Sequence, residues 1–272
     1  MQMNDITKIS SRDNAKLVMA RKVRDGKISD LIFIEGLRLA EETLRSDLSV
    51  SDCFVTSAFG DSERGGELIG KLKASRARIS EVADNLFRSI ADTNNSQGII
   101  LIAERPAMGR TLIEQNLRST SSGIVVLLNE TNDPSNLGAV FRTAEAAGVA
   151  GVIVSNGSAD VFSPKALRSA MGSSLRIPAW ENAEMADVIS WARAHGLRTT
   201  AADIDAETPY TDIEWKQPRL VIFGSEAHGL SRESLEMIDE TMLIPMQNGV
   251  ESLNLAVSAG IILFEAVRQR SS

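Results

Sequence analysis

The sequence predicts an α/β protein with two domains, the second of which is built on a parallel sheet. From residue 123 onward, short apolar runs alternate with segments of helical periodicity. Such alternation indicates parallel strands that are covered by helices on both faces. A second, separate pattern of strands and helices occupies residues 1–105. With 272 residues, the chain is long enough for two modest domains that each bury a core.

The first domain is expected to span residues 1–105 and to be a compact α/β unit. It opens with a basic amphipathic segment from Lys8 to Lys27. Strands are then predicted at 31–34, 50–56, 77–80 and 98–103, and helices up to about 44, at 63–74 and at 82–88. Residues 106–122 contain Pro106, Gly109 and a run of serines. These features predict a linker with a short helix.

The second domain is expected to span residues 123–272. Strands are predicted at 124–129, 151–155, 197–201, 220–223 and 241–244, and helices at 137–147, 164–171 and 185–195. A last helix is expected from Leu253 onward. Its apolar and small residues follow the spacing of one helix face and are predicted to pack on the core: Leu253, Ala256, Val257, Gly260, Ile261, Phe264 and Val267.

Composition narrows the class of protein. A hydrophobic content of 43% indicates a globular chain. No apolar run approaches the roughly 20 residues that cross a bilayer, and the first residues lack the apolar core of a signal peptide. Cys53 is the only cysteine, and His195 and His228 are the only histidines. We therefore expect a cytoplasmic protein without a membrane segment, a disulfide or a metal site.

The net charge of −7 is spread unevenly along the chain. Residues 1–105 carry 16 basic and 16 acidic side chains, which leaves 13 basic and 20 acidic ones for the rest. Between Lys8 and Lys27, seven basic side chains face only two acidic ones. A local basic stripe of this kind can follow a phosphate backbone although the whole chain is acidic. A solvated helix face explains the stripe equally well.

Polar residues follow three of the predicted strands. Asn136 and Arg142 come after strand 124–129, Glu226 lies in a glycine-bracketed loop after strand 220–223, and Ser252 and Asn254 precede the last helix. In open α/β sheets, ligands bind at the edge formed by the carboxyl ends of the strands. Two plainer interpretations stay open. Ser252 and Asn254 could merely cap a helix, and Arg142 could form a surface pair with Glu145.

Several common chemistries are excluded by missing motifs. No G-x-G-x-x-G follows a strand, so a dinucleotide-binding loop is not expected. The loop GSEAHG, residues 224–229, lacks the Lys-Ser/Thr pair of a phosphate-binding P-loop. Because no G-x-S-x-G elbow is present, Ser225 is a poor candidate for a hydrolase nucleophile.

Four segments together resemble the SpoU (TrmH-like) RNA ribose 2′-O-methyltransferases of the SPOUT superfamily. They read DPSNLGAVFRTAEAAGV from Asp133, SPKALRSAMGSSLRIP from Ser163, VIFGSEAHGLS from Val221, and IPMQNGVESLNLAVSAGIILFE from Ile244. Their order and spacing agree over about 140 residues. More loosely, the segments SRDNAKLVMARKVR, IFIEGLRLAEE and ADTNNSQGIILIA are similar to that family's substrate-binding domain, which is shaped like kink-turn-binding ribosomal proteins.

The resemblance implies a catalytic domain with a deep trefoil knot, S-adenosyl-L-methionine as cofactor, and a homodimer whose protomers complete each other's sites. By position, it implies the catalytic residues Asn136, Arg142, Glu226, Ser252 and Asn254. The cofactor-binding positions that it implies are Phe223, Gly224, Ile244, Met246, Ser252 and Leu253. Candidate RNA contacts are Lys16, Arg21, Lys22 and Arg168, and no metal is implied. Ala227 stands where many members have Gly and adds only a methyl group.

The implied reaction moves a methyl group to a ribose 2′-hydroxyl of structured RNA. The accessory domain favours 23S ribosomal RNA as the substrate, with transfer RNA as the alternative. Within the family, the Arg at the position of Arg142 has been proposed as a general base, but a clamp on an RNA phosphate explains a guanidinium equally well. A non-catalytic RNA-binding protein is a further alternative. A hydrolase that uses Ser252 and His228 is disfavoured because no acidic partner lies at motif spacing.

Overall fold

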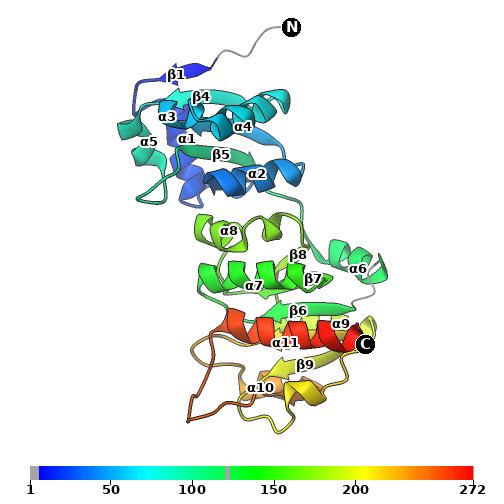
Figure 1. Cartoon of the computed structure of the whole chain (residues 1–272). Coiled ribbons are helices and arrows are strands. Elements are labelled where there is room, and N and C mark those ends of the chain that lie inside the picture. Colours follow the sequence, from blue (N-terminus) through cyan, green and yellow to red (C-terminus); the bar gives the residue numbers. More distant parts are fainter. Residues whose placement is uncertain (1–5, 120–122, 272) are drawn as a thin grey trace. The chain divides into compact units, whose positions relative to one another are not determined.

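The structure is a computed structural model and describes residues 6–119 and 123–271. The chain divides into two compact units. The N-terminal unit comprises Met1–Ala107 together with Phe162–Leu175, and the C-terminal unit comprises Met108–Val161 with Arg176–Ser272. Figure 1 shows the elements of both units in sequence colours. Each unit has its own sheet, so the predicted α/β class is confirmed.

The N-terminal unit is built on a five-stranded mixed sheet with the order β1-β4-β3-β5-β2. Strand β4 runs parallel to β1 and β3, whereas β5 is antiparallel to β3 and β2. The elements of this unit are β1 (Thr7–Ile9), α1 (Ala15–Arg24), β2 (Leu31–Glu35), α2 (Leu37–Arg45), β3 (Val50–Val55), α3 (Ser57–Gly60), α4 (Glu63–Ala74), β4 (Arg78–Val82), α5 (Asp84–Ile90), β5 (Ile99–Glu104), α8 (Pro164–Ala170) and the 3-10 turn η1 (Ser173–Leu175).

Helices cover both faces of this sheet because its central strands are apolar on both sides. On one face, α1 and α5 close a core that includes Leu17, Phe33, Phe54 and Ile102. Helices α2 and α4 lie against the sheet and against each other. Cys53, in β3, is fully buried.

The C-terminal unit is built on a six-stranded sheet, β11-β9-β10-β6-β7-β8, in which all pairs are parallel. Its elements are α6 (Arg110–Ser119), β6 (Ile124–Leu128), α7 (Pro134–Ala146), β7 (Gly151–Ser155), β8 (Ala179–Ala183), α9 (Met185–Ala194), β9 (Arg198–Ala202), the 3-10 turn η2 (Tyr210–Asp212), β10 (Arg219–Phe223), α10 (Arg232–Glu236), β11 (Glu240–Met242) and α11 (Leu255–Arg270).

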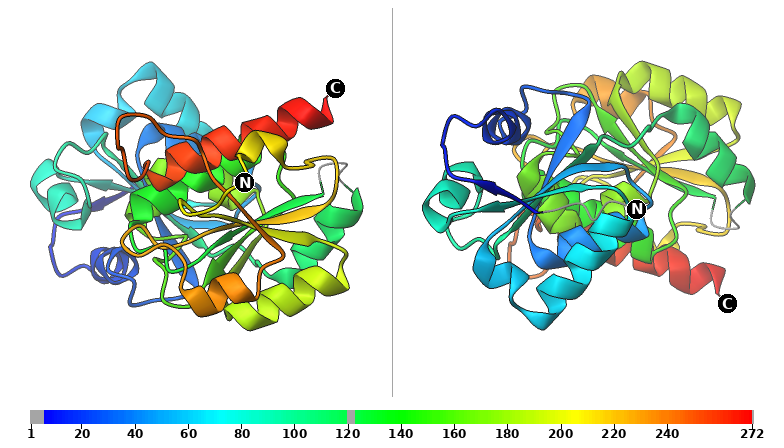
Figure 2. Two further views of the ribbon diagram at one scale, coloured as in Figure 1. Left: turned by 90° about the horizontal axis from the view of Figure 1, so that it is seen from below. Right: turned by 90° about the horizontal axis from the view of Figure 1, so that it is seen from above.

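The two faces of the parallel sheet carry different helices. Helices α6 and α9 close one core, in which Ile113, Val188 and Trp191 pack on Leu127 and Ile222. Helices α7 and α11 lie side by side on the opposite face, as Figure 2 shows. The central strands β6 and β10 are buried along their whole length.

Two strands were not predicted from the sequence. Strand β1 has only three residues, and β8 carries the largely polar sequence AWENA, so neither has the apolar run that marks a buried strand. Both are edge strands of their sheets.

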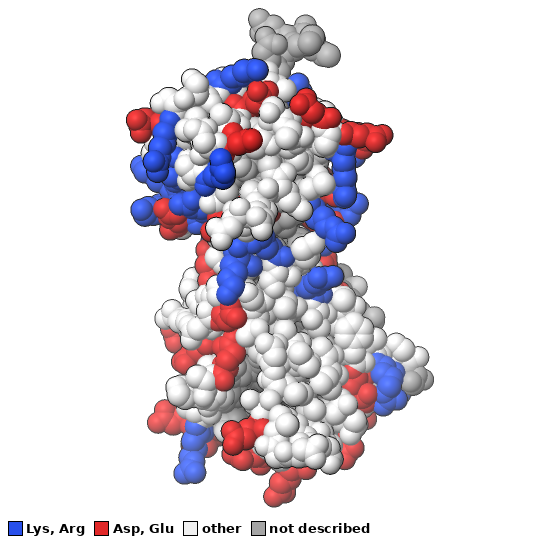
Figure 3. Space-filling view, turned by 60° about the vertical axis from the view of Figure 1, so that its left-hand side comes forward, with Lys and Arg blue, Asp and Glu red and all other residues white. Residues whose placement is uncertain are grey.

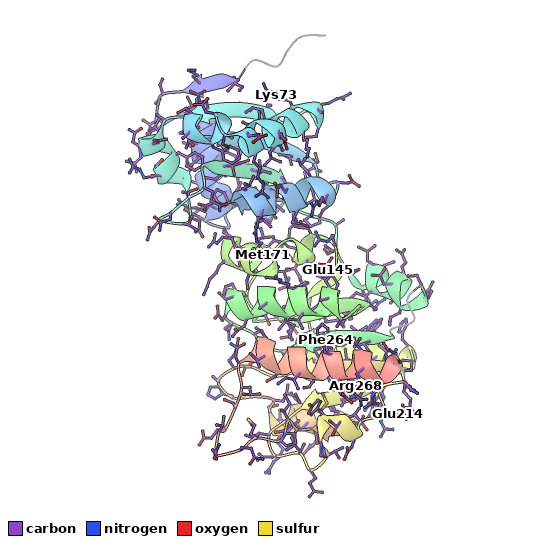
Figure 4. The ribbon with its side chains drawn as sticks, in the orientation of Figure 1. Lys73, Glu145, Met171, Glu214, Phe264 and Arg268 are labelled. Atoms are coloured by element: carbon purple, nitrogen blue, oxygen red, sulfur yellow. The ribbon has the colours of Figure 1, made fainter. Side chains whose placement is uncertain are left out.

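The predicted buried face of the last helix is wrong. Helix α11 buries Leu255, Ala259, Ile262, Leu263 and Ala266. The predicted stripe lies on the other side, where Leu253, Val257 and Phe264 are 38%, 51% and 50% exposed. Figure 4 labels Phe264 on this helix. Because both sides of the helix are apolar, periodicity alone could not select the side that faces the core.

No helix in the described part of the chain is long and apolar enough to cross a membrane. The trefoil knot that the resemblance implies stays a prediction. The domain boundaries expected from the sequence, at residues 105 and 122, stay predictions as well.

Cys53 should be protected in the native protein. Burial raises the pKa of its thiol to about 12, and the neighbouring Asp52 carboxylate adds to the rise. In the unfolded chain the thiol ionises at a pH of about 8.5. The stability of the fold should therefore decrease as the pH rises above that value, because only the unfolded state gains the thiolate.

The measurement is the rate of reaction with a thiol reagent at pH 8, with and without denaturant. We expect reaction only after unfolding. Rapid labelling of the native protein would contradict the burial of Cys53.

Candidate active site

The centre of the parallel sheet brings two loops to one edge. Strand β10 pairs in parallel with β6, so Phe223 lies opposite Leu128 at their carboxyl ends. The amide of Asn129 donates a 2.9 Å hydrogen bond to the carbonyl of Phe223. Consequently the loop that leads from β6 to α7 and the loop that follows β10 leave the sheet side by side.

Asn254 joins the start of the last helix to these loops. It is the N-cap of α11, and its Oδ1 accepts hydrogen bonds from the amides of Ala256 and Val257 at 2.9 and 3.4 Å. Its Nδ2 remains available and donates to Oδ1 of Asn136 at 2.9 Å. The plainer reading of Asn254 as a helix cap is therefore correct but incomplete, because the same amide also reaches α7.

Asn136 extends this connection to the third loop. Its Nδ2 donates to Oε1 of Glu226 at 3.1 Å. A chain of hydrogen bonds thus runs from Asn254 through Asn136 to Glu226, three residues that lie far apart in the sequence. We call these three residues the polar triad. The structure therefore brings together three of the five residues that the resemblance implied as catalytic.

The loop that carries Glu226 is tightly closed. Ser225 and Gly229 exchange backbone hydrogen bonds of 3.1 and 2.9 Å. A Cβ atom on Gly224 would overlap the backbone of Gly229 and Leu230, so only glycine fits at this position. The closed loop leaves the side chains of Glu226, Ala227 and His228 exposed.

Arg142 lies in the same helix as Asn136 but outside the triad. Its side chain is exposed and makes no hydrogen bond or ion pair within the described residues. The alternative pairing with Glu145 does not form, because Glu145 binds Arg176 through two hydrogen bonds of 2.6 and 3.0 Å. The guanidinium of Arg142 is thus free to bind an external anion. Ser252 is likewise exposed, two residues before the cap of α11.

The segment that joins β11 to α11, residues 243–254, crosses the carboxyl edge of the sheet. Strand β11 lies at one end of the sheet order, separated from β6 by β9 and β10. Helix α11 nevertheless begins beside Asn136, which follows β6. The connecting segment must therefore pass over the ends of β9 and β10.

This segment carries four of the implied cofactor positions, Ile244, Met246, Ser252 and Leu253, of which Ser252 is exposed. Ile244 and Met246 are half-buried, and Leu253 is 38% exposed. The other implied positions lie at the end of β10, where Phe223 is buried and Gly224 has no side chain. Partly exposed apolar side chains on this segment can cover the adenine ring and the carbon skeleton of S-adenosylmethionine. The residues present therefore fit S-adenosylmethionine.

The candidate RNA contacts of the N-terminal unit differ in availability. Lys16 already donates to Ser80 at 3.3 Å and lies 3.7 Å from Asp52. Arg21 donates to the carbonyl of Arg12 at 2.9 Å. Lys22 is exposed and has no such partner in the part of the chain that the structure describes. Figure 3 shows basic side chains on more than one side of this unit, with acidic side chains among them.

Arg168, on α8, makes an ion pair of 2.7 Å with Asp92. It belongs to the N-terminal unit and is only 30% exposed. It is therefore less available to RNA than Lys22, although the prediction that it contacts RNA stays open.

Sequence reasoning missed one feature of the N-terminal unit, a polar pocket beside residues 94–98. In the sequence, only the polar run Asn94-Asn95-Ser96-Gln97 pointed to this pocket. We used that run only as part of the looser resemblance to the substrate-binding domain. Among the described residues, no group of His, Cys, Asp and Glu side chains could hold a metal ion.

Comparison with known proteins identifies the family to which a chain with this fold and these loops belongs. Residues 123–264 match the SpoU rRNA Methylase family, and residues 14–101 match the MRM3-like substrate binding domain. The first match covers more than half of the chain. The chain belongs to the SpoU rRNA methylase family and is an RNA ribose 2′-O-methyltransferase.

Individual relatives resemble the chain over nearly its full length. It is 29% identical to the 23S rRNA (guanosine(2553)-2′-O)-methyltransferase RlmP of Bacillus subtilis, over 94% of this chain and 97% of the relative. It is 31% identical to the 23S rRNA (guanosine-2′-O-)-methyltransferase RlmB of Shewanella oneidensis, over 90% of this chain and all of the relative. The AdoMet-bound rRNA methyltransferase of Sinorhizobium meliloti superimposes with a TM-score of 0.82 at 27% identity, over 97% of this chain and 98% of that one.

The two roles of Asn254 can be separated by substitution. Asn254→Ala removes both the helix cap and the donor to Asn136, so we expect a loss of about 1 kcal/mol in the free energy of unfolding. Asn254→Asp keeps a cap acceptor but removes the donor, so stability should stay within about 0.5 kcal/mol of the original. Both variants should lose methyl transfer.

Urea unfolding and methyl incorporation into RNA measure the two effects. If Asn254→Asp retained full activity, the hydrogen bond from Asn254 to Asn136 would have no catalytic importance.

Proposed function

We propose that this protein transfers the methyl group of S-adenosylmethionine to a ribose 2′-hydroxyl of 23S ribosomal RNA. The observation that carries the proposal is the polar triad. It joins three loops at one sheet edge, and Arg142, which lies in the same helix as Asn136, makes no hydrogen bond or ion pair within the described residues. The family match and the 23S rRNA activity named for two full-length relatives support the choice of substrate.

The cofactor would lie along residues 243–254 and Gly224, with Ile244, Met246 and Leu253 providing apolar contacts. When bound, it supplies an electrophilic methyl group and departs as a neutral thioether, so no metal is needed for the leaving group. Because Gly224 has no side chain, the loop can close against the backbone of Gly229 and Leu230, and this closure would hold the peptide groups of the loop in fixed positions beside the cofactor.

The role that we assign to Arg142 is that of a phosphate clamp. A guanidinium is a planar cation, a form that suits the binding of a phosphate better than the removal of a proton. Its planar set of donors suits two oxygens of an RNA phosphate at once. Held in this way, the adjacent ribose is aligned for attack, and the positive charge stabilises negative charge that develops on the 2′-oxygen.

The polar triad would hold this arrangement in place. Asn254 and Asn136 fix the orientation of the Glu226 carboxylate, which keeps its second oxygen for a ligand donor. The exposed hydroxyl of Ser252 is placed to contact the ribose.

We also propose that the protein works as a homodimer through α7 and α11. Val257 and Phe264 on α11, and Leu253 just before that helix, form an exposed apolar stripe, and exposed apolar patches mark protein interfaces. A symmetric pairing would place the same stripe on both sides of the interface. The cytoplasm remains the proposed location.

The reaction itself is tested by mapping 2′-O-methyl sites. Ribosomal and transfer RNA from cells that lack the protein would be incubated with it and with labelled S-adenosylmethionine. We expect one methylated ribose in 23S rRNA. Methylation of transfer RNA alone would replace the proposed substrate. Cofactor binding without any methylated RNA would refute the reaction.

Substitution of Arg142 tests the clamp. Arg142→Ala and Arg142→Lys should each lower kcat/KM by about a hundredfold or more, because a planar two-bond contact that stabilises the transition state is lost. The affinity for S-adenosylmethionine should hardly change. Near-normal turnover of Arg142→Lys would show that a point charge suffices.

Charge placed on the exposed stripe tests the dimer. Phe264→Glu should give a monomer in sedimentation equilibrium, because a carboxylate would be buried in an apolar interface. Ile204→Glu is the matched control, since Ile204 is 51% exposed and lies outside α7 and α11. An active monomeric wild-type protein at working concentration would rule the homodimer out.

A further inference from the structure

Helix α7 places a carboxylate close to the proposed phosphate clamp. Glu145, labelled in Figure 4, lies three residues after Arg142 in this helix. Helical side chains at this spacing are neighbours, with about 5–6 Å between their Cβ atoms. If Glu145 paired with Arg142, it would occupy the donors that we assign to an RNA phosphate. The Glu145 carboxylate is therefore a competitor of RNA unless another group holds it.

Arg176 holds this carboxylate. Its Nε donates to Oε1 of Glu145 at 2.6 Å, and its Nη2 donates to Oε2 at 3.0 Å. Two parallel hydrogen bonds from one guanidinium are the strongest geometry for such a pair. Both side chains are only 33% exposed. Solvent and salt therefore screen this ion pair less than a fully exposed one.

The backbone beside Arg176 is fixed on the sheet. Arg176 lies between the turn η1 and strand β8, and the next residue, Ile177, is buried. The carbonyl of Pro178 accepts a 2.9 Å hydrogen bond from the amide of Val152 in β7. The guanidinium of Arg176 is thus presented from an anchored segment, and the ion pair joins this segment to the last turn of α7.

The ion pair also determines the charge beside the clamp. Because Arg176 neutralises Glu145, Arg142 contributes a positive charge that no described hydrogen bond or ion pair offsets. Without Arg176, the charges of Glu145 and Arg142 would cancel, and the carboxylate would repel an approaching phosphate. Removal of Arg176 would therefore weaken the clamp without altering the clamp residue.

We propose that Arg176 is a positioning residue for methyl transfer, which keeps Arg142 available to RNA by binding the carboxylate that would otherwise occupy it. The inference rests on the proposed function, in which Arg142 holds an RNA phosphate. In this role Arg176 contacts neither RNA nor cofactor. It acts only through Glu145.

A purely structural role of the same ion pair leads to a different expectation. A brace between α7 and the segment before β8 is lost when either partner is removed, so removal of both cannot repair it. If Arg176 instead withholds Glu145 from Arg142, then removal of the Glu145 carboxylate makes Arg176 unnecessary. A double variant therefore separates the two roles.

The test compares Arg176→Ala with the double variant Arg176→Ala/Glu145→Gln in the full-length protein. Arg193→Ala is the matched control. Arg193 also pairs with a carboxylate, that of Asp239, but it lies in α9 on the opposite face of the sheet from α7. Steady-state methylation of ribosomal RNA from cells that lack the protein gives kcat and the KM for RNA. Calorimetric titration gives the affinity for S-adenosylmethionine.

We expect Arg176→Ala to raise the KM for RNA about fivefold, which corresponds to about 1 kcal/mol. Its kcat should hardly change, because saturating RNA displaces Glu145 from Arg142, and its affinity for S-adenosylmethionine should stay the same. The double variant and Arg193→Ala should remain within about twofold of the wild-type KM. A double variant as impaired as Arg176→Ala would overturn the proposal. An equal loss in Arg193→Ala would also overturn it, because long-range charge would then be the cause.

Arg142→Ala separates failure of this inference from failure of the proposed function. Because Arg176 acts through Arg142, adding Arg176→Ala to Arg142→Ala should lower kcat/KM no further. If Arg142→Ala loses activity while Arg176→Ala keeps the wild-type KM, only the role of Arg176 is refuted. Near-normal activity of Arg142→Ala would refute the clamp, and the role of Arg176 would fall with it.

Discussion

The parallel pairing of β6 with β10 determines the position of every site residue in the C-terminal unit. The two strands end level with each other, with Leu128 opposite Phe223. The loops that follow them therefore lie side by side, whatever the sequences of the loops are. The hydrogen bonds of the polar triad then fix the side chains of loops that the sheet has already brought together. The apolar strands thus contribute to function indirectly, since their burial fixes the register on which the hydrogen bonds of Asn136 depend.

At the amino ends of the strands, an ion pair links β10 to β11. Arg219 in β10 is almost fully buried and contacts Glu240 in β11, while Thr200 in β9 binds both side chains. The guanidinium of Arg270, near the end of α11, donates to the carbonyls of Trp215 and Gln217 at 2.6 and 2.8 Å. Residues 243–254 are therefore anchored at β11 and at α11. Glu240 and Thr200 thus satisfy the guanidinium of Arg219, which would be costly to bury without partners.

Local patterns predicted most of the fold because each pattern has a local physical cause. The central strands are apolar on both faces, and the alternation of strand and helix indicated the parallel sheet. The triad could be anticipated only as residues near one edge, since hydrogen bonds between positions 136, 226 and 254 depend on tertiary structure. For the same reason the sequence could not decide whether Arg142 pairs with Glu145, because the partner of Glu145, Arg176, lies 31 residues away. For α11, two apolar sides left the buried side undetermined, and the exposed one is the surface that we propose as the dimer interface.

Gly224 has a consequence for how this loop can change in evolution. The overlap that any larger residue would create is with backbone atoms of Gly229 and Leu230, which cannot rotate away as a side chain can. Replacement would have to open the turn, and Glu226 would then move with it. In contrast, Ala227 and His228 point to solvent and meet no such barrier. Tolerance of substitution should therefore differ sharply within six residues. Gly224 is fixed by the backbone that it packs on and Glu226 by its hydrogen bond to Asn136, whereas Ala227 and His228 can vary.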